Sequence, residues 1–318
     1  MNRRDFTKWI AAAAGTATLL RPSQTARAAS NDSPDSAKKA GGPWKLSLSE
    51  ISTLNAPFAD DVTAYAAAGF DAIGLWEFKL PKDDDAAGET LRRSGLAVAN
   101  CVPAVPSILP WDLPGMEGPR DPQERIDHLC ASMGRLAKYN PASVLVISGP
   151  MGKFPPDKAR AIVIGGLRQI GTAARAAKVP LGLEPVNPIQ HDTTSFVNSI
   201  AGAMDLLKEA DVEGLGIMAD TYNLWNENPA DLAAIASQVK GLHVADMPLA
   251  AQRTDRLLPL EGGNRTTALV SALIGAGWRG IIDIEIFSTP DRFWGLPVDE
   301  AARRAHAADV ALRQKLHT

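Results

Sequence analysis

Strand-like and helix-like segments alternate along this chain from Lys45 onward, and this alternation constrains the fold more than any other feature. Short apolar runs of strand length are each followed by a segment whose apolar residues recur at helical spacing. Eight strands are expected, at 45–49, 72–76, 96–102, 143–147, 181–184, 215–219, 241–245 and 281–286. Strict alternation predicts a parallel sheet, and eight units predict closure into a single-domain α/β fold, the (β/α)8 TIM barrel.

The segments between the strands predict eight helices, at 59–68, 84–93, 123–139, 157–177, 194–210, 229–237, 266–276 and 298–316. An open doubly wound sheet is the alternative fold for such a pattern. That fold usually carries a phosphate-binding Gly-x-Gly-x-x-Gly turn after its first strand. Here the stretch from Ser49 to Pro57 contains no glycine, so the barrel is favoured.

The first 43 residues differ in composition from the rest and predict an export signal. Arg3 and Arg4 form a twin-arginine pair, and the apolar run 9–20 is shorter than the roughly 20 residues of a membrane span. Residues 26–28 read Ala-Arg-Ala, the small-x-small pattern that signal peptidases cut. We expect delivery to the periplasm by the twin-arginine export machinery. The predicted boundaries are a signal peptide at 1–28, a flexible linker at 29–43 and the barrel at 44–318.

The composition narrows the range of partners. The net charge is −3, which gives no basic surface for nucleic acid. No segment after the signal is apolar enough to predict a stable membrane span. A small molecule is therefore the expected partner, and the sequence leaves the oligomeric state open, a homo-oligomer included.

Polar residues end the last four predicted strands: Glu184, Asp220, His243 and Glu285. Taken singly, each has an ordinary explanation as a helix cap, an ion-pair partner or a buried histidine. In a parallel barrel, however, the carboxyl ends of the strands meet at one mouth, where three carboxylates and an imidazole would need a cation among them. This donor set suits Mn²⁺, the favoured ion, or Mg²⁺, Co²⁺ or Fe²⁺, whereas structural zinc prefers thiolates.

The longest irregular segment, 103–120, follows the third predicted strand. It contains five prolines together with Trp111 and Met116. Its position at the barrel mouth favours a lid or a wall of a substrate pocket. A rigid surface loop is the alternative that the sequence leaves open.

Six segments of the chain resemble the sugar phosphate isomerase/epimerase superfamily. They read Gly-Phe-Asp-Ala-Ile-Gly-Leu-Trp-Glu at 69–77, Leu-Glu-Pro-Val-Asn at 183–187, Met-Ala-Asp-Thr-Tyr-Asn at 218–223, Gly-Leu-His-Val-Ala-Asp at 241–246, Leu-Glu-Gly-Gly at 260–263, and Gly-Trp-Arg-Gly at 277–280 leading to Glu285. These xylose isomerase-like TIM barrels include ketose 3-epimerases and inosose dehydratases. The resemblance spans nearly all of the chain after Lys45.

By position, the resemblance implies that Glu184, Asp220, His243 and Glu285 hold the metal and that the two glutamates transfer protons. Asn223 stands where the family has a histidine, so proton transfer at that point is in doubt. The arginine that often follows the histidine of strand seven is displaced here. The candidate substrate-binding residues are Trp76, Glu77, Asn187, Asn223 and Arg253, with Arg256 as the alternative arginine and Lys79 and His191 as further residues of the mouth.

The predicted function is a metal-dependent isomerase or epimerase of a ketose-like carbohydrate. A metal-bound enediolate would form, with proton transfer by Glu184 and Glu285. A lyase or dehydratase on a keto-sugar, keto-glycoside or inosose shares the first half of this mechanism and stays open. An exported metal- or sugar-binding protein without turnover is the alternative from another class. With five histidines in all, a three-metal endonuclease site is not expected.

Overall fold

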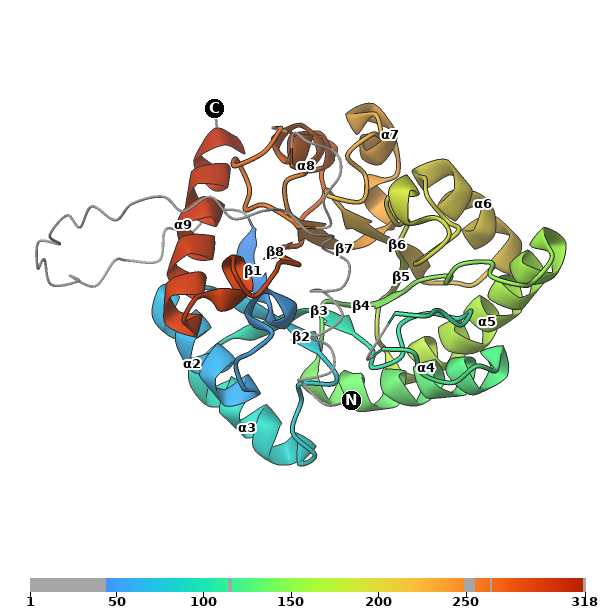
Figure 1. Cartoon of the computed structure of the whole chain (residues 1–318), viewed down its shortest axis with the longest axis horizontal. Coiled ribbons are helices and arrows are strands. Elements are labelled where there is room, and N and C mark those ends of the chain that lie inside the picture. The colour runs from blue at the N-terminus through green and yellow to red at the C-terminus, as the bar shows by residue number, and fades with distance from the viewer. Residues whose placement is uncertain (1–43, 114–115, 249–254, 264, 317–318) are drawn as a thin grey trace, which may run out of the picture.

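The strands of this chain close on themselves into a barrel. The computed structural model describes residues 44–113, 116–248, 255–263 and 265–316. Within these residues the sheet runs β1 to β8 in chain order, every neighbouring pair is parallel, and β8 pairs with β1 (Figure 1). The strands are β1 (Lys45–Ser49), β2 (Ala72–Trp76), β3 (Ala97–Val102), β4 (Ser143–Val146), β5 (Leu181–Leu183), β6 (Leu215–Asp220), β7 (Val239–Val244) and β8 (Ile281–Ile284).

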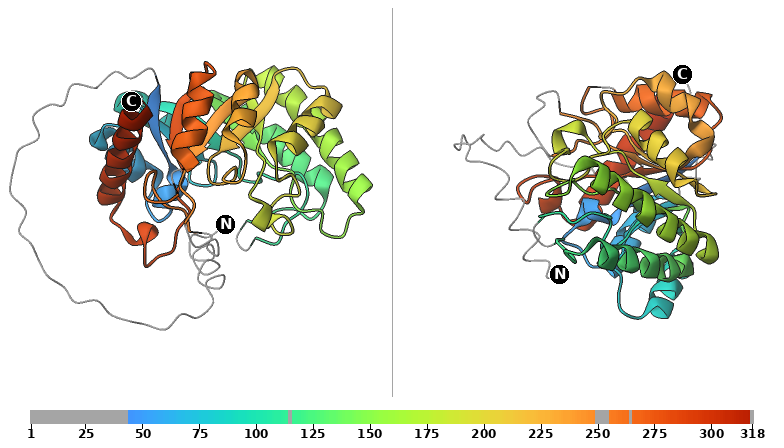
Figure 2. Two further views of the ribbon diagram at one scale, coloured as in Figure 1. Left: turned by 90° about the horizontal axis from the view of Figure 1, so that it is seen from above. Right: turned by 90° about the vertical axis from the view of Figure 1, so that its right-hand side faces the viewer.

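A ring of helices surrounds the barrel, as the two perpendicular views in Figure 2 show. The helices are α2 (Phe58–Ala68), α3 (Asp84–Ser94), α4 (Pro122–Leu136), α5 (Pro156–Ala177), α6 (Ile200–Ala210), α7 (Pro229–Ala234), α8 (Arg265–Gly275) and α9 (Val298–Leu316). The predicted (β/α)8 barrel is therefore confirmed. The predicted signal peptide and linker, 1–43, lie outside the described residues.

One predicted helix is too long at its start. The expected helix 194–210 begins only at Ile200, because the amides of Thr194 and Ser195 turn back to the carbonyl of Gln190. Ser199 then accepts a hydrogen bond from the amide of Gly202 and caps α6. The segment before α6 is thus free to line the barrel mouth.

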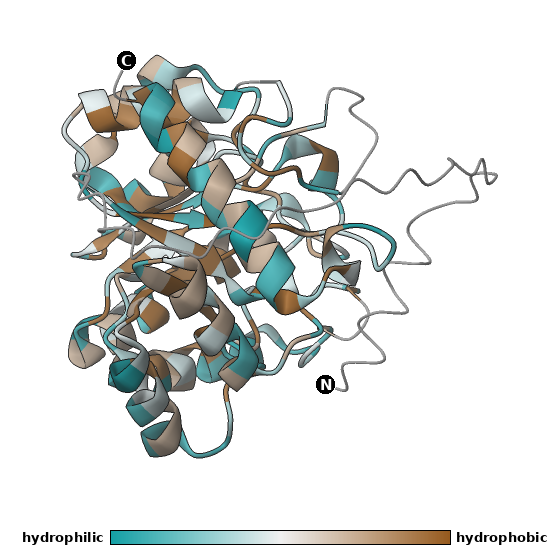
Figure 3. Cartoon of the chain, turned by 90° about the vertical axis from the view of Figure 1, so that its left-hand side faces the viewer, coloured by the Kyte–Doolittle hydropathy of each residue, from teal (hydrophilic) through white to brown (hydrophobic). Residues whose placement is uncertain are grey.

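The helices pack their apolar faces on the outside of the strands. In Figure 3 the strands at the centre are mostly brown, whereas teal residues lie along the outer faces of the helices. Helix starts are fixed by capping carboxylates: Asp83 accepts from the amides of Asp85 and Ala86, and Asp121 does the same for α4. Such a cap is worth about 1 kcal/mol. None of the described helices combines the length and apolar character that crossing a membrane requires.

The loop between β3 and α4 is held in place by a buried arginine. Arg125 of α4 is fully buried and donates to the carbonyls of Ser107, Glu117 and Pro119 and to the hydroxyl of Ser107. Ser107 also forms an isolated parallel bridge with Ile147 beyond β4. The described part of this loop, 103–113 and 116–120, therefore forms a wall of the barrel mouth.

Candidate active site

The four polar residues at the ends of the last strands come together at the barrel mouth. Ligand atoms of Glu184, Asp220 and His243 all lie within 4.8 Å of one another. The fourth residue joins them, because Glu285 Oε2 lies 3.4 Å from His243 Nδ1. All four residues are buried. We call Glu184, Asp220, His243 and Glu285, together with Arg256, the mouth cluster.

Arg256 brings a permanent positive charge into this cluster. Its Nη1 lies 2.8 Å from Asp220 Oδ2 and 2.9 Å from Glu285 Oε2. The guanidinium lies over the rings of Tyr222 and Phe287, 4.7 Å from each ring centre. Its backbone amide donates to the carbonyl of Phe287, which fixes the segment against the end of β8. Of the two candidate arginines, Arg256 therefore lies in the mouth cluster, and Arg253 lies outside the described residues.

Burial and mutual charge shift the pKa values of the cluster. Burial first and the charge of Asp220 second raise the pKa of Glu184 to about 8. Burial also raises the pKa of Glu285, against the opposing charges of His243 and Arg256. For His243, burial alone would lower the pKa, but Glu285, Asp283 and Glu184 outweigh it and bring the pKa to about 10. The cluster therefore attracts positive charge, whether as protons or as a metal ion.

The residues fit a divalent metal ion. Neither ring nitrogen of His243 has a hydrogen-bond partner within the described part of the chain, although both are buried. An orphaned imidazole beside carboxylate oxygens is the arrangement that a metal ion completes, because it accepts lone pairs from both kinds of ligand. Nδ1 faces Glu285 and Nε2 faces Asp283, so Nδ1 is the ring nitrogen on the side of the carboxylates that could hold a metal ion.

A second layer of polar residues lies behind His243, inside the barrel. Oδ2 of Asp283, on β8, lies 3.6 Å from His243 Nε2. The same oxygen accepts a hydrogen bond of 3.2 Å from the side-chain amide, Nδ2, of Asn100. Asn100 in turn accepts a hydrogen bond from Ser143. Glycine leaves space for the carboxylate, because a Cβ on Gly74 would lie 2.3 Å from Asp283 Oδ2. A carboxylate behind a histidine ligand orients the ring and selects its tautomer.

The two asparagines predicted at the site have different positions. Asn223 lines the cavity above the cluster, and its Nδ2 donates to Glu184 Oε1 at 2.8 Å and to Asp220 Oδ2 at 3.0 Å. Asn187 is buried behind it, where its side chain accepts from the amide of Ile189 and donates to the carbonyl of Tyr222. Asn223 therefore holds two ligand carboxylates together, and Asn187 shapes the loop.

The remaining predicted residues divide into one at the cavity and three elsewhere. Trp76 lines the cavity. Glu77 does not: its Oε2 accepts from the amide of Ala104 and the hydroxyl of Ser132, so it anchors the β3–α4 loop. Lys79 is buried in an ion pair with Asp61, and His191 is exposed beside Asn198. The structure thus gives Glu77, Lys79 and His191 positions away from the cavity lining.

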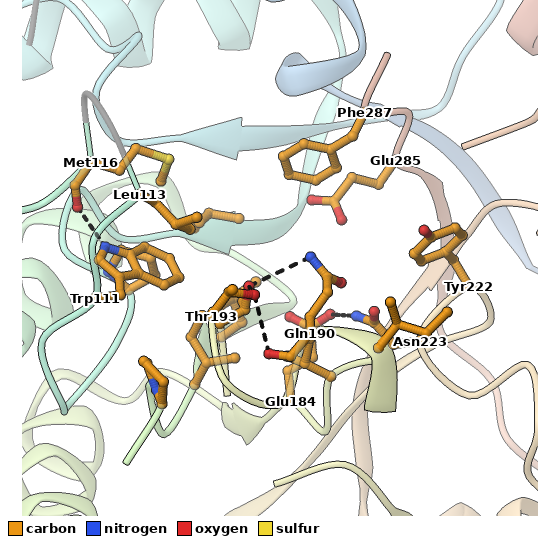
Figure 4. Close-up of a pocket in the computed structure, with 18 of the residues that line it drawn as sticks. Trp111, Leu113, Met116, Glu184, Gln190, Thr193, Tyr222, Asn223, Glu285 and Phe287 are labelled. Carbon is orange, nitrogen blue, oxygen red and sulfur yellow. Dashed lines mark hydrogen bonds between the residues drawn. The ribbon is translucent and has the colours of Figure 1, made fainter. Parts of the chain in front are cut away.

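A cavity of about 600 Å³ lies over the cluster. Glu184, Asn223, Arg256 and Glu285 reach into it, and Figure 4 shows Glu285 and Glu184 entering from opposite sides. Much of the remaining wall is aromatic: Trp76, Trp111, Tyr222, Phe287 and Trp294. Trp111 comes from the 103–120 segment, which was expected to be a lid or a wall of the pocket, and Arg256 is the arginine that was named as the alternative to Arg253.

Comparison with known proteins places the chain in a family. The model of the Xylose isomerase-like TIM barrel family matches residues 62–312. The chain belongs to this family, and the superfamily expected from the sequence is confirmed.

Individual similar proteins differ in what they do. A 3-dehydroshikimate dehydratase of Pseudomonas aeruginosa is 25% identical over 281 residues, which cover 83% of this chain but only 40% of that protein. Two solved structures share the fold at 18% identity. The IOLI protein with a bound zinc atom has a TM-score of 0.71 and covers 85% of this chain and 98% of that one. The 3-keto-D-glucoside 4-epimerase YcjR from E. coli has a TM-score of 0.66 and covers 85% and 99%.

Proposed function

We propose that this protein is a metal-dependent isomerase or epimerase of a carbohydrate that carries a carbonyl group. The observation that supports this most directly is the pair of buried glutamates, Glu184 and Glu285, which enter the cavity from opposite sides beside an orphaned histidine. Membership of the family and the epimerase among the similar structures agree with this reaction class.

The metal site would be formed by Glu184, Asp220, His243 and Glu285. A divalent cation held there, with Mn²⁺ favoured by the donor set, supplies Lewis acidity toward the carbonyl and hydroxyl oxygens of the sugar.

The two glutamates provide the proton transfers. Arg256 beside Glu285 stabilises its carboxylate, so Glu285 is suited to remove the proton from the carbon next to the carbonyl. The electron pair of that C–H bond moves to the carbonyl oxygen and gives an enediolate. Glu184, on the opposite side of the cavity, would take up a proton from water and return it to the enediolate. Return to the same carbon gives an epimer, and return to its neighbour gives an isomer.

A lyase or dehydratase is the second candidate, and Asn223 is the observation that favours it. The side-chain amide of Asn223 donates to Glu184 and Asp220 and cannot titrate, so the histidine that the resemblance implies at this position is replaced by a group that donates no proton to substrate. The same enediolate would then expel a β-substituent, which leaves with a proton from Glu184. The dehydratase among the similar proteins agrees with this outcome.

Deuterium exchange tests the proposal. The protein, loaded with Mn²⁺, is incubated in D₂O with ketoses, keto-glycosides and inososes, and NMR follows both C–H exchange and products. Metal-dependent exchange is expected, and the product separates epimer, isomer and elimination. Binding of a sugar without exchange at any carbon would contradict the proposal and favour a binding protein.

Export is a separate proposal, which rests on the sequence of residues 1–28 alone. The full chain is expected in the periplasm of a bacterium with twin-arginine export, and the Arg3→Lys/Arg4→Lys variant in the cytoplasm. Cell fractionation checks this, and equal distribution of the two proteins would contradict it.

A further inference from the structure

The cavity over the mouth cluster has two chemically different parts. Ionic and amide groups concentrate at the end formed by Glu184, Asn223, Arg256 and Glu285. The β3–α4 loop supplies a wall with little polar side chain: Pro106, Pro110, Trp111, Leu113 and Met116. In Figure 4 Trp111, Leu113 and Met116 stand on one side of the cavity, and Tyr222 and Asn223 on the other.

The tryptophans of the cavity turn their only polar atom away from it. Trp111 Nε1 donates to the carbonyl of Met116 at 2.6 Å. Trp294 Nε1 donates to the carbonyl of Ile51 at 2.7 Å, and Trp76 Nε1 donates to the hydroxyl of Ser49 at 3.0 Å. All three indole N–H groups are therefore satisfied by the protein, and the rings present only carbon surface to a ligand.

A free sugar would match this wall poorly. Each carbon of an ordinary sugar carries an oxygen, and a hydroxyl buried without a hydrogen-bond partner costs about 1–3 kcal/mol. The polar end can satisfy the hydroxyl groups of one ring. Against the loop wall, by contrast, the three indoles offer no donor, and Asp112 is engaged in an exposed ion pair with Arg120. The polar side chains nearest this wall, Gln190, Thr193 and Thr194, are already hydrogen-bonded among themselves.

One further apolar side chain stands among the polar lining residues Gln190, Asp192, Thr193 and Thr194. Ile189, in the short helix after Asn187, is 62% exposed and is the one exposed large hydrophobic residue among those described. The cavity volume of 600 Å³ lies within the roughly 300–1,000 Å³ typical of pockets for drug-sized ligands, so it has room for more than one small ring.

We propose that the substrate is a glycoside with an apolar, planar aglycone, and that Trp111, Leu113, Met116 and Ile189 form the aglycone subsite. The sugar ring lies at the end with Glu184 and Glu285, so this inference rests on the proposed function for the placement of the sugar. The apolar group then covers carbon surface at the loop wall and the rim.

Matched pairs of glycosides test the subsite. Phenyl and methyl glycosides of glucose, galactose and xylose, as both anomers, are titrated by calorimetry into the Mn²⁺-loaded protein. These compounds carry no carbonyl group, so binding is measured without turnover. In at least one pair the phenyl glycoside is expected to bind about tenfold more tightly or better. Equal affinities in every pair, or no binding by any phenyl glycoside, would overturn the proposal.

Two variants outside the proton-transfer machinery locate the effect. Leu113→Asn and Ile189→Ser are expected to weaken the phenyl glycoside several-fold and to leave the methyl glycoside unchanged, and Ile189→Leu to restore the preference. A preference that survives both polar variants would contradict this location.

The outcomes separate the two proposals. A phenyl preference without C–H exchange on any compound keeps the subsite and removes the isomerase. Exchange on free ketoses without a phenyl preference supports the isomerase and contradicts the aglycone subsite.

Discussion

The charged residues buried beside β1 and β2 differ from those of the mouth cluster in how their charges are balanced. Beside β1 and β2, Lys79 Nζ lies 2.5 Å from Asp61 Oδ2 and donates to the carbonyls of Glu50 and Thr53. Thr53 donates to Asp61, and Glu50 accepts from the amide of Trp76. We call Glu50, Thr53, Asp61 and Lys79 the β1–β2 cluster. Every donor of its ammonium group has a protein partner.

The polar atoms of the mouth cluster are not all paired within the described protein. Asp220 and Glu285 pair with Arg256, Glu184 lies close to Asp220, and neither ring nitrogen of His243 has a hydrogen-bond partner within the described residues. Glu184 and Glu285 also border the cavity, whereas no residue of the β1–β2 cluster does. Buried charge that is enclosed by protein supports the fold, and buried charge that borders a cavity beside an unpartnered histidine is available for a ligand.

The largest expected effect is the loss of turnover in Glu184→Gln and Glu285→Gln. Each variant removes a proton-transfer group, so the exchange rate should fall about 10²- to 10⁴-fold while the protein stays folded. Glu50→Gln is the matched control: burial raises the pKa of Glu50 to about 8, so glutamine resembles its protonated form and the exchange rate should stay near wild type. Unchanged exchange in both mouth variants would contradict the assignment.

Removal of the ammonium group from the β1–β2 cluster should act on stability instead. Lys79→Met leaves the buried Asp61 carboxylate without its cation, which costs about 3–5 kcal/mol of the free energy of unfolding. Urea denaturation measures this loss, and the double variant Asp61→Asn/Lys79→Met should recover much of it. A single variant as stable as wild type would show that the cluster does not support the fold.

Asp283 tests the comparison further, because it is buried like the β1–β2 cluster but faces His243 of the mouth cluster. Asp283→Asn should weaken Mn²⁺ binding about 10- to 100-fold, since the ring of His243 loses the carboxylate that orients it. Asp309→Asn, which changes another buried carboxyl, on α9, is the control and should leave the Mn²⁺ affinity unchanged. Equal affinity in the Asp283 variant and wild type would contradict the orienting role.

The smallest effect is expected at Asp84, at the start of α3. Burial opposes its ionisation, but Lys138, Tyr139 and Arg135 lower the pKa of Asp84 to about 2. A lowered pKa in the folded state stabilises the protein above the unfolded pKa, and this contribution disappears as the pH falls from about 4 to about 2. Asp84→Asn should therefore cost about 1–2 kcal/mol at pH 7 and almost nothing at pH 2. Urea denaturation at both pH values checks this, and a constant difference would contradict it.

The fold and the four strand-end residues were accessible from the sequence because parallel strands bring their carboxyl ends together whatever the loops do. Arg256 was only one of two candidate arginines, because it lies thirteen positions after His243, and the bridge between Asp246 and Leu257 is what brings it to the cluster. Asp283 was not predicted, because it lies inside an apolar strand, between Ile282 and Ile284, rather than at the strand end where Glu285 stands.

The misplaced start of α6 has a similar cause. Residues 194–199 have polar and apolar spacing compatible with a helix. Their first two amides, however, donate to the carbonyl of Gln190, and Ser199 caps the helix that follows. Ser199 before the apolar run was the available signal. Glu77 was placed at the mouth because it follows Trp76, yet its side chain turns to Ala104 and Ser132.

A titration with Mn²⁺, followed by the electron paramagnetic resonance of the free ion, tests the central claim that the mouth cluster is a metal site. One ion per chain is expected to bind to the wild type and to Glu50→Gln with similar affinity, and at least about tenfold more weakly to Asp220→Asn. No binding to the wild type, or equal binding to the Asp220→Asn variant, would contradict the account.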